Sequence, residues 1–145
     1  MDDIKRKAKE RGQKLRLPYA GALLPTEAHT LMEQGAKLVD VRTDAELQYV
    51  GSIPGSEAIE WNDYPDGKRN PDFLAQLEGA VAKDEPVMFI CRSGARSHHA
   101  AVAATQAGWR EAYNVLEGFE GDKDPEGHRN TVGGWKVARL PWVQG

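Results

Sequence analysis

The sequence contains a single cysteine, and its four histidines are scattered along the chain. One thiol cannot close a disulfide within the chain, and histidines without a second thiol offer no zinc spacing, so we expect no metal and no other cofactor. The charged first eleven residues lack the apolar segment of a secretory signal, and no apolar run approaches the length of a membrane span. These absences favour a reducing compartment, the cytoplasm, over secretion or the membrane.

A strong excess of either charge is also missing, because the net charge is only −3 and both signs are mixed along the chain. Such a surface argues against nucleic acid and against an anionic membrane as partners. A chain of 145 residues can bury one core, and no glycine-, serine- or proline-rich linker marks a second domain. We therefore expect a helical extension over residues 1–16 and one domain over residues 17–145. Residues 2–12 have almost no apolar face, so their helix is predicted to be solvated or frayed.

The most informative stretch runs from Val87 to Gly108. Four consecutive apolar residues, 87–90, are typical of a strand that is buried on both faces. An alanine-rich run that ends at Gly108 indicates a helix with a glycine stop, and we expect that helix to begin at about Ser97. The short loop between strand and helix opens with the only cysteine, Cys91.

This loop has the composition of an anion-binding site around a thiolate. A loop that leads into a helix N-terminus directs unpaired backbone N–H groups and the positive end of the helix dipole at one spot. Gly94 permits backbone turns that are closed to other residues. Arg92 and Arg96 place two cations where a helix normally prefers acidic side chains, which points to an anionic ligand.

Two other interpretations of this loop are a structural core cysteine and a catalytic Cys–His pair. Most free cysteines are small core residues, but a core residue needs neither the two arginines nor the glycine that accompany Cys91. A Cys–His pair is also conceivable with His98 or His99. We expect both histidines to be solvated in the first helical turn, because a thiolate held by N–H groups and arginines needs no general base.

The whole chain alternates strands and helices, which predicts an α/β fold with a central parallel β-sheet and helices on both faces. Strands are predicted at 36–41, 58–61, 87–90 and 112–116, and helices at 26–34, 43–50, 70–81 and 97–107. Residues 15–21 are predicted to be an irregular lead-in, residues 62–69 a surface loop, and residues 117–134 a long loop. Ligands bind such sheets at the carboxyl ends of the strands, where Cys91 would lie.

Three helix starts are predicted from capping residues. Thr26 is the expected N-cap of the first helix in the domain. Thr43 and Glu46 have the spacing of a capping box for the second helix. Asn70 and Pro71 are expected at the N-cap and first position of the third.

Three charged residues lie near the end of the strand at 36–41 or soon after it, namely Asp40, Arg42 and Glu46. Charges at strand ends often satisfy loop backbone or pair with one another, so we assign all three a structural role near the site rather than a catalytic one. Glu46 is the expected partner of Arg42.

Three motifs in this order resemble those of the rhodanese sulfurtransferases. The loop Cys91–Arg92–Ser93–Gly94–Ala95–Arg96–Ser97 is similar to the family's active-site loop. Asp40–Val41–Arg42 resembles its first signature. Glu46 with 51–56 resembles its second, which usually has His where this chain has Ser52. The segments 116–122 and 133–142 are similar to a single-domain bacterial subgroup, so the resemblance spans roughly residues 17–144.

The resemblance implies a rhodanese-like domain and a sulfurtransferase with Cys91 as the catalytic nucleophile. It implies substrate binding by the rest of the loop: Arg92, Ser93, Gly94, Ala95, Arg96 and Ser97. A small-molecule sulfur donor such as thiosulfate would load a Cys91 persulfide. Cyanide, a small thiol or a protein thiol would then accept the sulfur.

Two other functions belong to different classes. A phosphatase or arsenate reductase uses the same architecture, but the phosphatase loop is one residue longer, whereas Arg96 here follows Cys91 by five positions. A tighter loop leaves less room for a tetrahedral phosphate. A non-catalytic rhodanese-like binding module generally loses the cysteine or the charges of the loop, and this chain keeps both.

Overall fold

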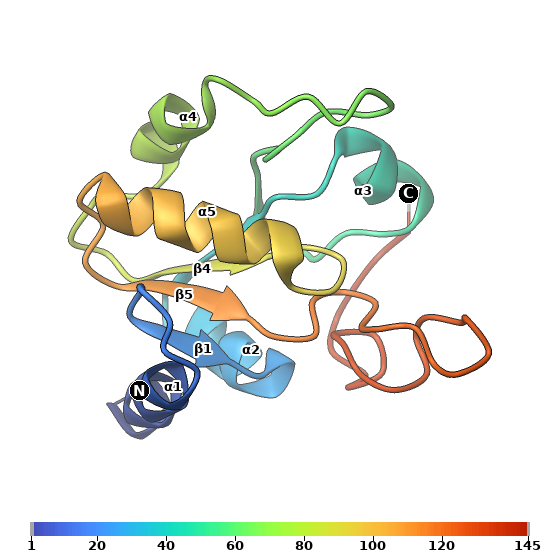
Figure 1. Cartoon of the computed structure of the whole chain (residues 1–145), viewed down its shortest axis with the longest axis horizontal. Coiled ribbons are helices and arrows are strands. Elements are labelled where there is room, and N and C mark those ends of the chain that lie inside the picture. The colour runs from blue at the N-terminus through green and yellow to red at the C-terminus, as the bar shows by residue number, and fades with distance from the viewer. Residues whose placement is uncertain (1, 145) are drawn as a thin grey trace.

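The structure, a computed structural model that describes residues 2–144, is built on one five-stranded parallel sheet (Figure 1). The strands are β1 (Gly21–Leu23), β2 (Lys37–Asp40), β3 (Glu57–Ala58), β4 (Val87–Ile90) and β5 (Ala112–Val115), in the spatial order β1-β5-β4-β2-β3. All neighbouring strands pair in parallel. The helices are α1 (Asp2–Lys14), α2 (Pro25–Glu33), α3 (Asp44–Tyr49), α4 (Phe73–Ala80) and α5 (Ala95–Gln106).

The apolar residues form two cores, one on each face of the sheet. On one face, α4 and α5 cover Val39 and Phe89 with buried residues such as Phe73 and Ala104. The other face has its own cluster, which contains Leu31 of α2. The predicted parallel sheet with helices on both faces is confirmed. Within residues 2–144, no helix combines the length and the apolar character that crossing a membrane requires.

The central strand explains where the site lies. All four residues of β4 are buried, because β2 and β5 flank the strand and helices cover both of its faces. In register, Met88 pairs with Leu38 of β2 and with Tyr113 of β5. Residue 91 therefore follows the middle strand at the carboxyl edge of the sheet. The N-terminus of the following α5, which is the positive end of its dipole, lies at the same edge.

The N-terminal helix α1 packs against the edge of the sheet. Ala8 is fully buried, and a Cβ atom on Gly21 of β1 would lie 2.6 Å from the carbonyl carbon and oxygen of Ala8. Arg11 donates hydrogen bonds to the Ala22 carbonyl and to the Glu27 carboxylate. The expectation of a solvated or frayed helix is wrong, because Ala8 and Gly21 allow a close approach and Ile4 packs against the core.

Strand β1 was not predicted from the sequence. It consists of only Gly21, Ala22 and Leu23, which is too short for a periodic pattern. It is set by its parallel pairing with β5 and by the packing of α1. The predicted strand at 58–61 also differs, since β3 is limited to Glu57 and Ala58.

Only one of the predictions for the first two helix starts is confirmed. The capping box of α3 is confirmed: the Thr43 hydroxyl accepts a bond from the Glu46 N–H at 3.2 Å, and the Glu46 carboxylate accepts one from the Thr43 N–H at 3.1 Å. Thr26 is not an N-cap, because α2 begins one residue earlier with Pro25 at its first position. Glu27 reaches back to the N–H of Leu24 at 2.8 Å instead.

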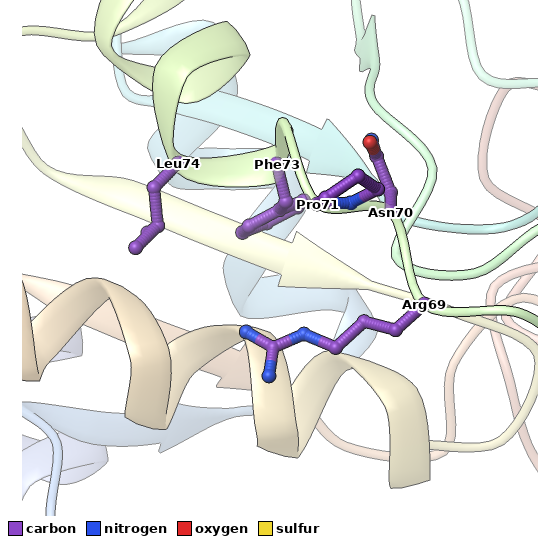
Figure 2. Close-up of a pocket in the computed structure, with 5 residues that line it drawn as sticks. All are labelled: Arg69, Asn70, Pro71, Phe73 and Leu74. Atoms are coloured by element: carbon purple, nitrogen blue, oxygen red, sulfur yellow. The ribbon is translucent and has the colours of Figure 1, made fainter.

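Helices α4 and α5 also begin away from the predicted residues. Figure 2 shows Asn70 and Pro71 on the loop that leads into α4, where the Asn70 side chain accepts a bond from the Asp72 N–H at 3.0 Å. The helix itself begins at Phe73. Helix α5 begins at Ala95, with Gly94 as its N-cap at φ +115°, so it starts two residues before the predicted Ser97.

Candidate active site

Cys91 is the residue immediately after β4, and it is almost completely buried at 1% exposure. Its Sγ atom accepts a hydrogen bond from the Gly94 N–H at 3.1 Å and lies 3.2 Å from the Ser97 hydroxyl oxygen. The loop that follows β4 therefore curls around the sulfur atom. A buried thiol with a backbone donor aimed at it is an environment that suits an anionic sulfur.

The loop after β5 holds the outer side of the Cys91 loop. The Cys91 carbonyl accepts a bond from the Phe119 N–H at 2.8 Å, and the Arg92 carbonyl accepts from Glu120 at 3.0 Å and Gly121 at 3.2 Å. Across a trans peptide, the N–H points opposite to the carbonyl. Because the carbonyls of residues 91 and 92 face outward, the N–H groups of residues 92 and 93 face the inside of the loop.

The first turn of α5 adds further donors. Among the described residues, the N–H groups of Ala95, Arg96 and Ser97 have no protein acceptor, as expected for the first turn of a helix. The positive end of the helix dipole lies at the same place. The loop thus presents free donors and partial positive charge around the Cys91 sulfur, which favours anionic sulfur species there.

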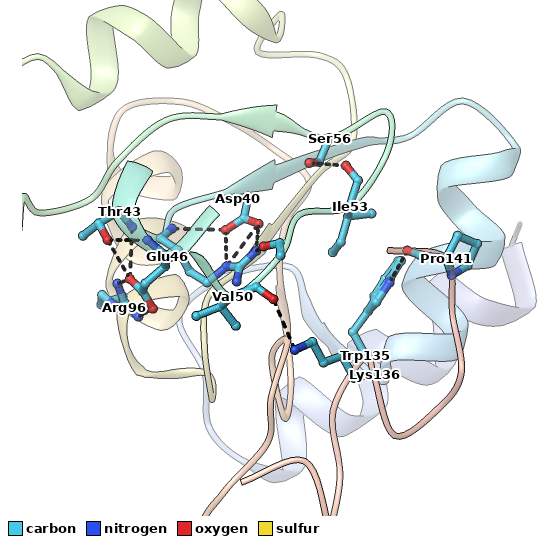
Figure 3. A network of polar contacts seen from close by, with 12 residues as sticks. Asp40, Thr43, Glu46, Val50, Ile53, Ser56, Arg96, Trp135, Lys136 and Pro141 are labelled. Atoms are coloured by element: carbon cyan, nitrogen blue, oxygen red, sulfur yellow. Dashed lines mark hydrogen bonds and ion pairs between the residues drawn. The ribbon is translucent and has the colours of Figure 1, made fainter. Parts of the chain in front are cut away.

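Arg96 forms an ion pair with Glu46 of α3, as Figure 3 shows. Its guanidinium donates to the two carboxylate oxygens at 2.6 and 2.8 Å. The hydrogen bond from Arg96, together with those from Thr43, outweighs the effect of burial and lowers the pKa of Glu46 to about 2. The hydrogen bond to Glu46 in turn raises the pKa of Arg96. The predicted pairing of Glu46 with Arg42 is therefore wrong.

Arg42 pairs with Asp40 instead. Both side chains are fully buried, and Arg42 Nη2 lies 2.7 Å from Asp40 Oδ2 and donates to the Gly51 carbonyl at 2.9 Å. The Arg42 guanidinium also lies over the Phe119 ring, 4.1 Å from its centre. Through the bond to Gly51, two residues after the end of α3, Arg42 ties the end of β2 to the helix that carries Glu46.

Arg92 is exposed, and its side chain forms no hydrogen bond or ion pair within residues 2–144. It lines a polar cavity of about 320 Å³ next to the loop. The cavity is bounded by Thr43, Glu46, Asn62, Asp63, Tyr64, Pro65, Gly67, Arg92 and Arg96. The separate cavity of about 270 Å³ in Figure 2 is lined by residues 69–74 and by none of the loop. The first cavity therefore brings both arginines of the Cys91 loop to one polar surface.

Ser97 and Asn114 form a buried polar contact behind the sulfur. The Ser97 hydroxyl lies 2.6 Å from Asn114 Oδ1, and the two residues are 0% and 3% exposed. Asn114 belongs to β5, and sequence reasoning missed it. A signal was present, because an asparagine stands at the centre of an otherwise apolar strand.

His98 is not solvated as predicted. Its Nδ1 atom lies 2.8 Å from the Tyr19 hydroxyl, and burial, with a smaller contribution from His99, lowers the pKa of His98. Burial raises the pKa of Tyr19, and the neighbouring Asn114 side chain offsets part of that rise. Tyr19 and His98 therefore form a partly buried hydrogen-bonded pair beside α5. His99 is exposed, as the sequence predicted.

Comparison with known proteins identifies the family. The family model of the rhodanese-like domain matches residues 24–124, more than half of the chain, so this protein belongs to the rhodanese-like domain family. The resemblance drawn from the sequence motifs is confirmed.

Individual relatives agree with this assignment. The crystal structure of Rv0390 from Mycobacterium tuberculosis is 44% identical, with a TM-score of 0.79 over 88% of this chain and 99% of the other. The thiosulfate sulfurtransferase GlpE of Pseudomonas aeruginosa is 35% identical over 68% of this chain and 79% of its own. An uncharacterized protein of Rickettsia rickettsii is 35% identical over 81% of this chain and 92% of its own.

Substitution of Gly118 tests how the two loops meet. A Cβ atom there would lie 2.5 to 2.6 Å from the Arg92 and Cys91 carbonyl groups, and the residue has φ +66°. We expect Gly118→Ala to lower the free energy of unfolding, measured in urea, by about 2–4 kcal/mol. Gly127→Ala is the control, because Gly127 has φ +83° with no atom within 4 Å. Equal losses in the two variants would mean that contact with the Cys91 loop is unimportant.

Substitution of Glu46 tests the ion pair with Arg96. Folding lowers the pKa of Glu46 from 4.5 to about 2, so the carboxylate stabilises the fold above pH 4.5 and this contribution is lost as the pH falls toward 2. We expect Glu46→Gln to cost on the order of 2–3 kcal/mol at pH 7 and progressively less below pH 4.5, in urea unfolding at several pH values. Asp44→Asn, on the same helix, is the control. A difference in unfolding free energy between Glu46→Gln and the parent protein that does not change with pH would contradict the pairing.

Proposed function

We propose that the protein is a sulfurtransferase that carries a sulfane sulfur on Cys91. The observation that carries this proposal is the buried Cys91 sulfur inside a loop whose N–H groups point inward. A persulfide is anionic at neutral pH, and inward N–H groups stabilise it as an oxyanion hole stabilises an oxyanion. The similarity to thiosulfate sulfurtransferases supports thiosulfate as a donor.

The proposed reaction has two steps. The Cys91 thiolate attacks the outer sulfur of thiosulfate, the sulfur–sulfur bond of thiosulfate breaks, and its electron pair leaves on sulfite. The acceptor, cyanide or a thiolate, then attacks the outer sulfur of the Cys91 persulfide. That sulfur–sulfur bond breaks and the electron pair returns to Cys91. No metal, cofactor or external oxidant is needed, and a reducing compartment, the cytoplasm, suits a thiol that must stay unpaired.

The two arginines of the loop have different tasks in this proposal. Arg96 is held by Glu46, so it braces the loop against α3 and its charge is partly neutralised. Arg92 lines the same polar cavity with no side-chain partner among the described residues. We therefore assign the sulfonate oxygens of the donor chiefly to Arg92, through the forked geometry that a guanidinium offers. The sequence analysis assigned both arginines to substrate binding.

The size of the loop separates this proposal from phosphatase or arsenate reductase chemistry. Convergent N–H groups fit an anion of a particular size, and this ring runs only from Cys91 to Arg96. Helix α5 begins inside that span, at Ala95, which tightens the ring further. A single sulfur atom has fewer steric needs than a phosphoryl group with its three oxygens.

Steady-state assays with thiosulfate and with an aryl phosphate test the proposal. We expect thiocyanate formation from thiosulfate and cyanide, negligible aryl phosphate hydrolysis, and loss of thiocyanate formation in Cys91→Ser with the fold retained. Unfolding in urea checks the fold of the variant. Faster turnover of the aryl phosphate, lost in Cys91→Ser, would replace this function with a phosphatase. Substantial thiocyanate formation by Cys91→Ser would refute the mechanism.

Substitution of each arginine in turn tests the separate roles proposed for Arg92 and Arg96. Loss of a charge-assisted contact typically costs about 1.5–3 kcal/mol, so we expect Arg92→Gln to lower kcat/KM for thiosulfate roughly tenfold or more. The stability of this variant should stay near that of the parent, because the Arg92 side chain has no partner in residues 2–144. Arg96→Gln should be destabilised instead, because it leaves Glu46 unpaired. An unchanged kcat/KM in Arg92→Gln would remove the residue from donor binding.

A further inference from the structure

Both groups that touch the Cys91 sulfur are linked to one side chain on β5. The Ser97 hydroxyl lies 2.6 Å from Asn114 Oδ1, and Asn114 Nδ2 donates to the Gly94 carbonyl at 3.3 Å. Gly94 and Ser97 are the residues whose N–H and hydroxyl groups contact the sulfur. Asn114 itself is 3% exposed, so water does not compete for its amide.

The orientation of the Asn114 amide follows from its partners. A carbonyl oxygen can only accept, so the NH₂ group of Asn114 must face Gly94 and its Oδ1 must face Ser97. A serine hydroxyl has one proton. Ser97 therefore donates that proton to Asn114, and its oxygen can only accept from the Cys91 thiol.

The loop N–H groups favour an anionic sulfur, but the bond from Ser97 to Asn114 suits the thiol and not the thiolate. With Cys91 ionised, the Sγ atom and the Ser97 oxygen would face each other as two acceptors. Ser97 must then turn its proton toward the sulfur and give up its bond to Asn114. The bond from Ser97 to the anionic sulfur is stronger than its bond to Asn114, although the buried Asn114 Oδ1 is then left without a donor.

We propose that Ser97 and Asn114 form a hydrogen-bond switch at the Cys91 sulfur, in which Ser97 donates to the anionic sulfur and Asn114, as a positioning residue, competes for the same proton. Ser97 thereby stabilises the thiolate that attacks the donor and leaves from the persulfide. Asn114 opposes ionisation of the resting thiol through its bond with the Ser97 hydroxyl. The mechanistic consequence rests on the proposed sulfur transfer, whereas the switch itself is a property of the thiol.

The surrounding charges are common to all the variants needed for a test. The charged and titratable groups near the sulfur and the switch are Arg92 of the loop, Arg96 and His98 of α5, Glu46 of α3, Asp40 and Arg42 at the end of β2, and Tyr19 ahead of β1. Changes at residues 97 and 114 keep all of these side chains, although a change at Asn114 also removes its contacts with Tyr19 and Gly94. Comparison of the Asn114 variant in the parent and Ser97→Ala backgrounds separates those contacts from the switch.

Alkylation of Cys91 by iodoacetamide, followed across pH, is the direct test. The thiolate attacks the reagent carbon and iodide leaves, and because the chain has one cysteine the reaction reports on Cys91 alone. The midpoint of the rate profile reports ionisation, and the plateau at high pH reports access. Since no sulfur donor is used, the result is independent of whether Cys91 accepts sulfur.

We expect Ser97→Ala to move the midpoint to higher pH and to slow alkylation at pH 7 about tenfold, as for a lost hydrogen bond to a charged group. Asn114→Leu, which keeps the number and branching of the side-chain heavy atoms, should move the midpoint to lower pH. In the double variant the midpoint should equal that of Ser97→Ala. Asn114→Ala takes the place of Asn114→Leu if urea unfolding shows that the leucine variant does not fold.

Two results would overturn the switch. The first is an effect of Asn114→Leu on the midpoint that persists unchanged in the Ser97→Ala background. The second is a change in the plateau without a change in the midpoint, which would mean that Asn114 only restricts access to the sulfur.

Discussion

The site depends on the orientation of two peptide groups. The carbonyls of Cys91 and Arg92 are held outward by N–H groups of Phe119, Glu120 and Gly121, and this turns the opposite ends of those peptides toward the sulfur. Without these bonds, the short loop between β4 and α5 could relax with its carbonyls inward, which would repel an anion. The long loop after β5 thus has a definite role in the fold, because it shapes the lining of the site from behind.

Charge is distributed around this loop so that each guanidinium has its own place. Arg42 is buried with Asp40 and fastens the end of α3, and α3 presents Glu46 to Arg96. Arg96 in turn fixes the first turn of α5. The Arg42 bond to the Gly51 carbonyl connects β2 with the end of α3, and the Glu46–Arg96 ion pair connects α3 with α5. Of the two arginines of the loop, Arg92 has no side-chain partner among residues 2–144. In the proposed mechanism, the ion-paired Arg42 and Arg96 hold the surroundings of the loop, and Arg92 binds the donor at the entrance of the loop.

Local patterns predicted the α/β fold and the position of Cys91, because a buried strand, a loop and a helix N-terminus lie next to one another in the chain. Contacts between distant segments were not predictable in this way. Glu46 pairs with Arg96, fifty residues away, rather than with the nearby Arg42. Asn114 reaches Ser97 only because β5 lies beside β4. Helix α1 packs through Ala8 against Gly21, small residues that give no hydrophobic periodicity, and the three-residue β1 gives no pattern at all.

The central claim is that Cys91 accepts a sulfane sulfur, and the intact mass of the protein after thiosulfate treatment tests it most directly. The account predicts a gain of one sulfur atom per chain, absent in Cys91→Ser and removed by cyanide or a thiol. Because the chain has a single cysteine, the added mass can be assigned to one residue. An unchanged mass in protein that is folded and still alkylated at Cys91, or an added sulfur that persists in Cys91→Ser, would contradict the account.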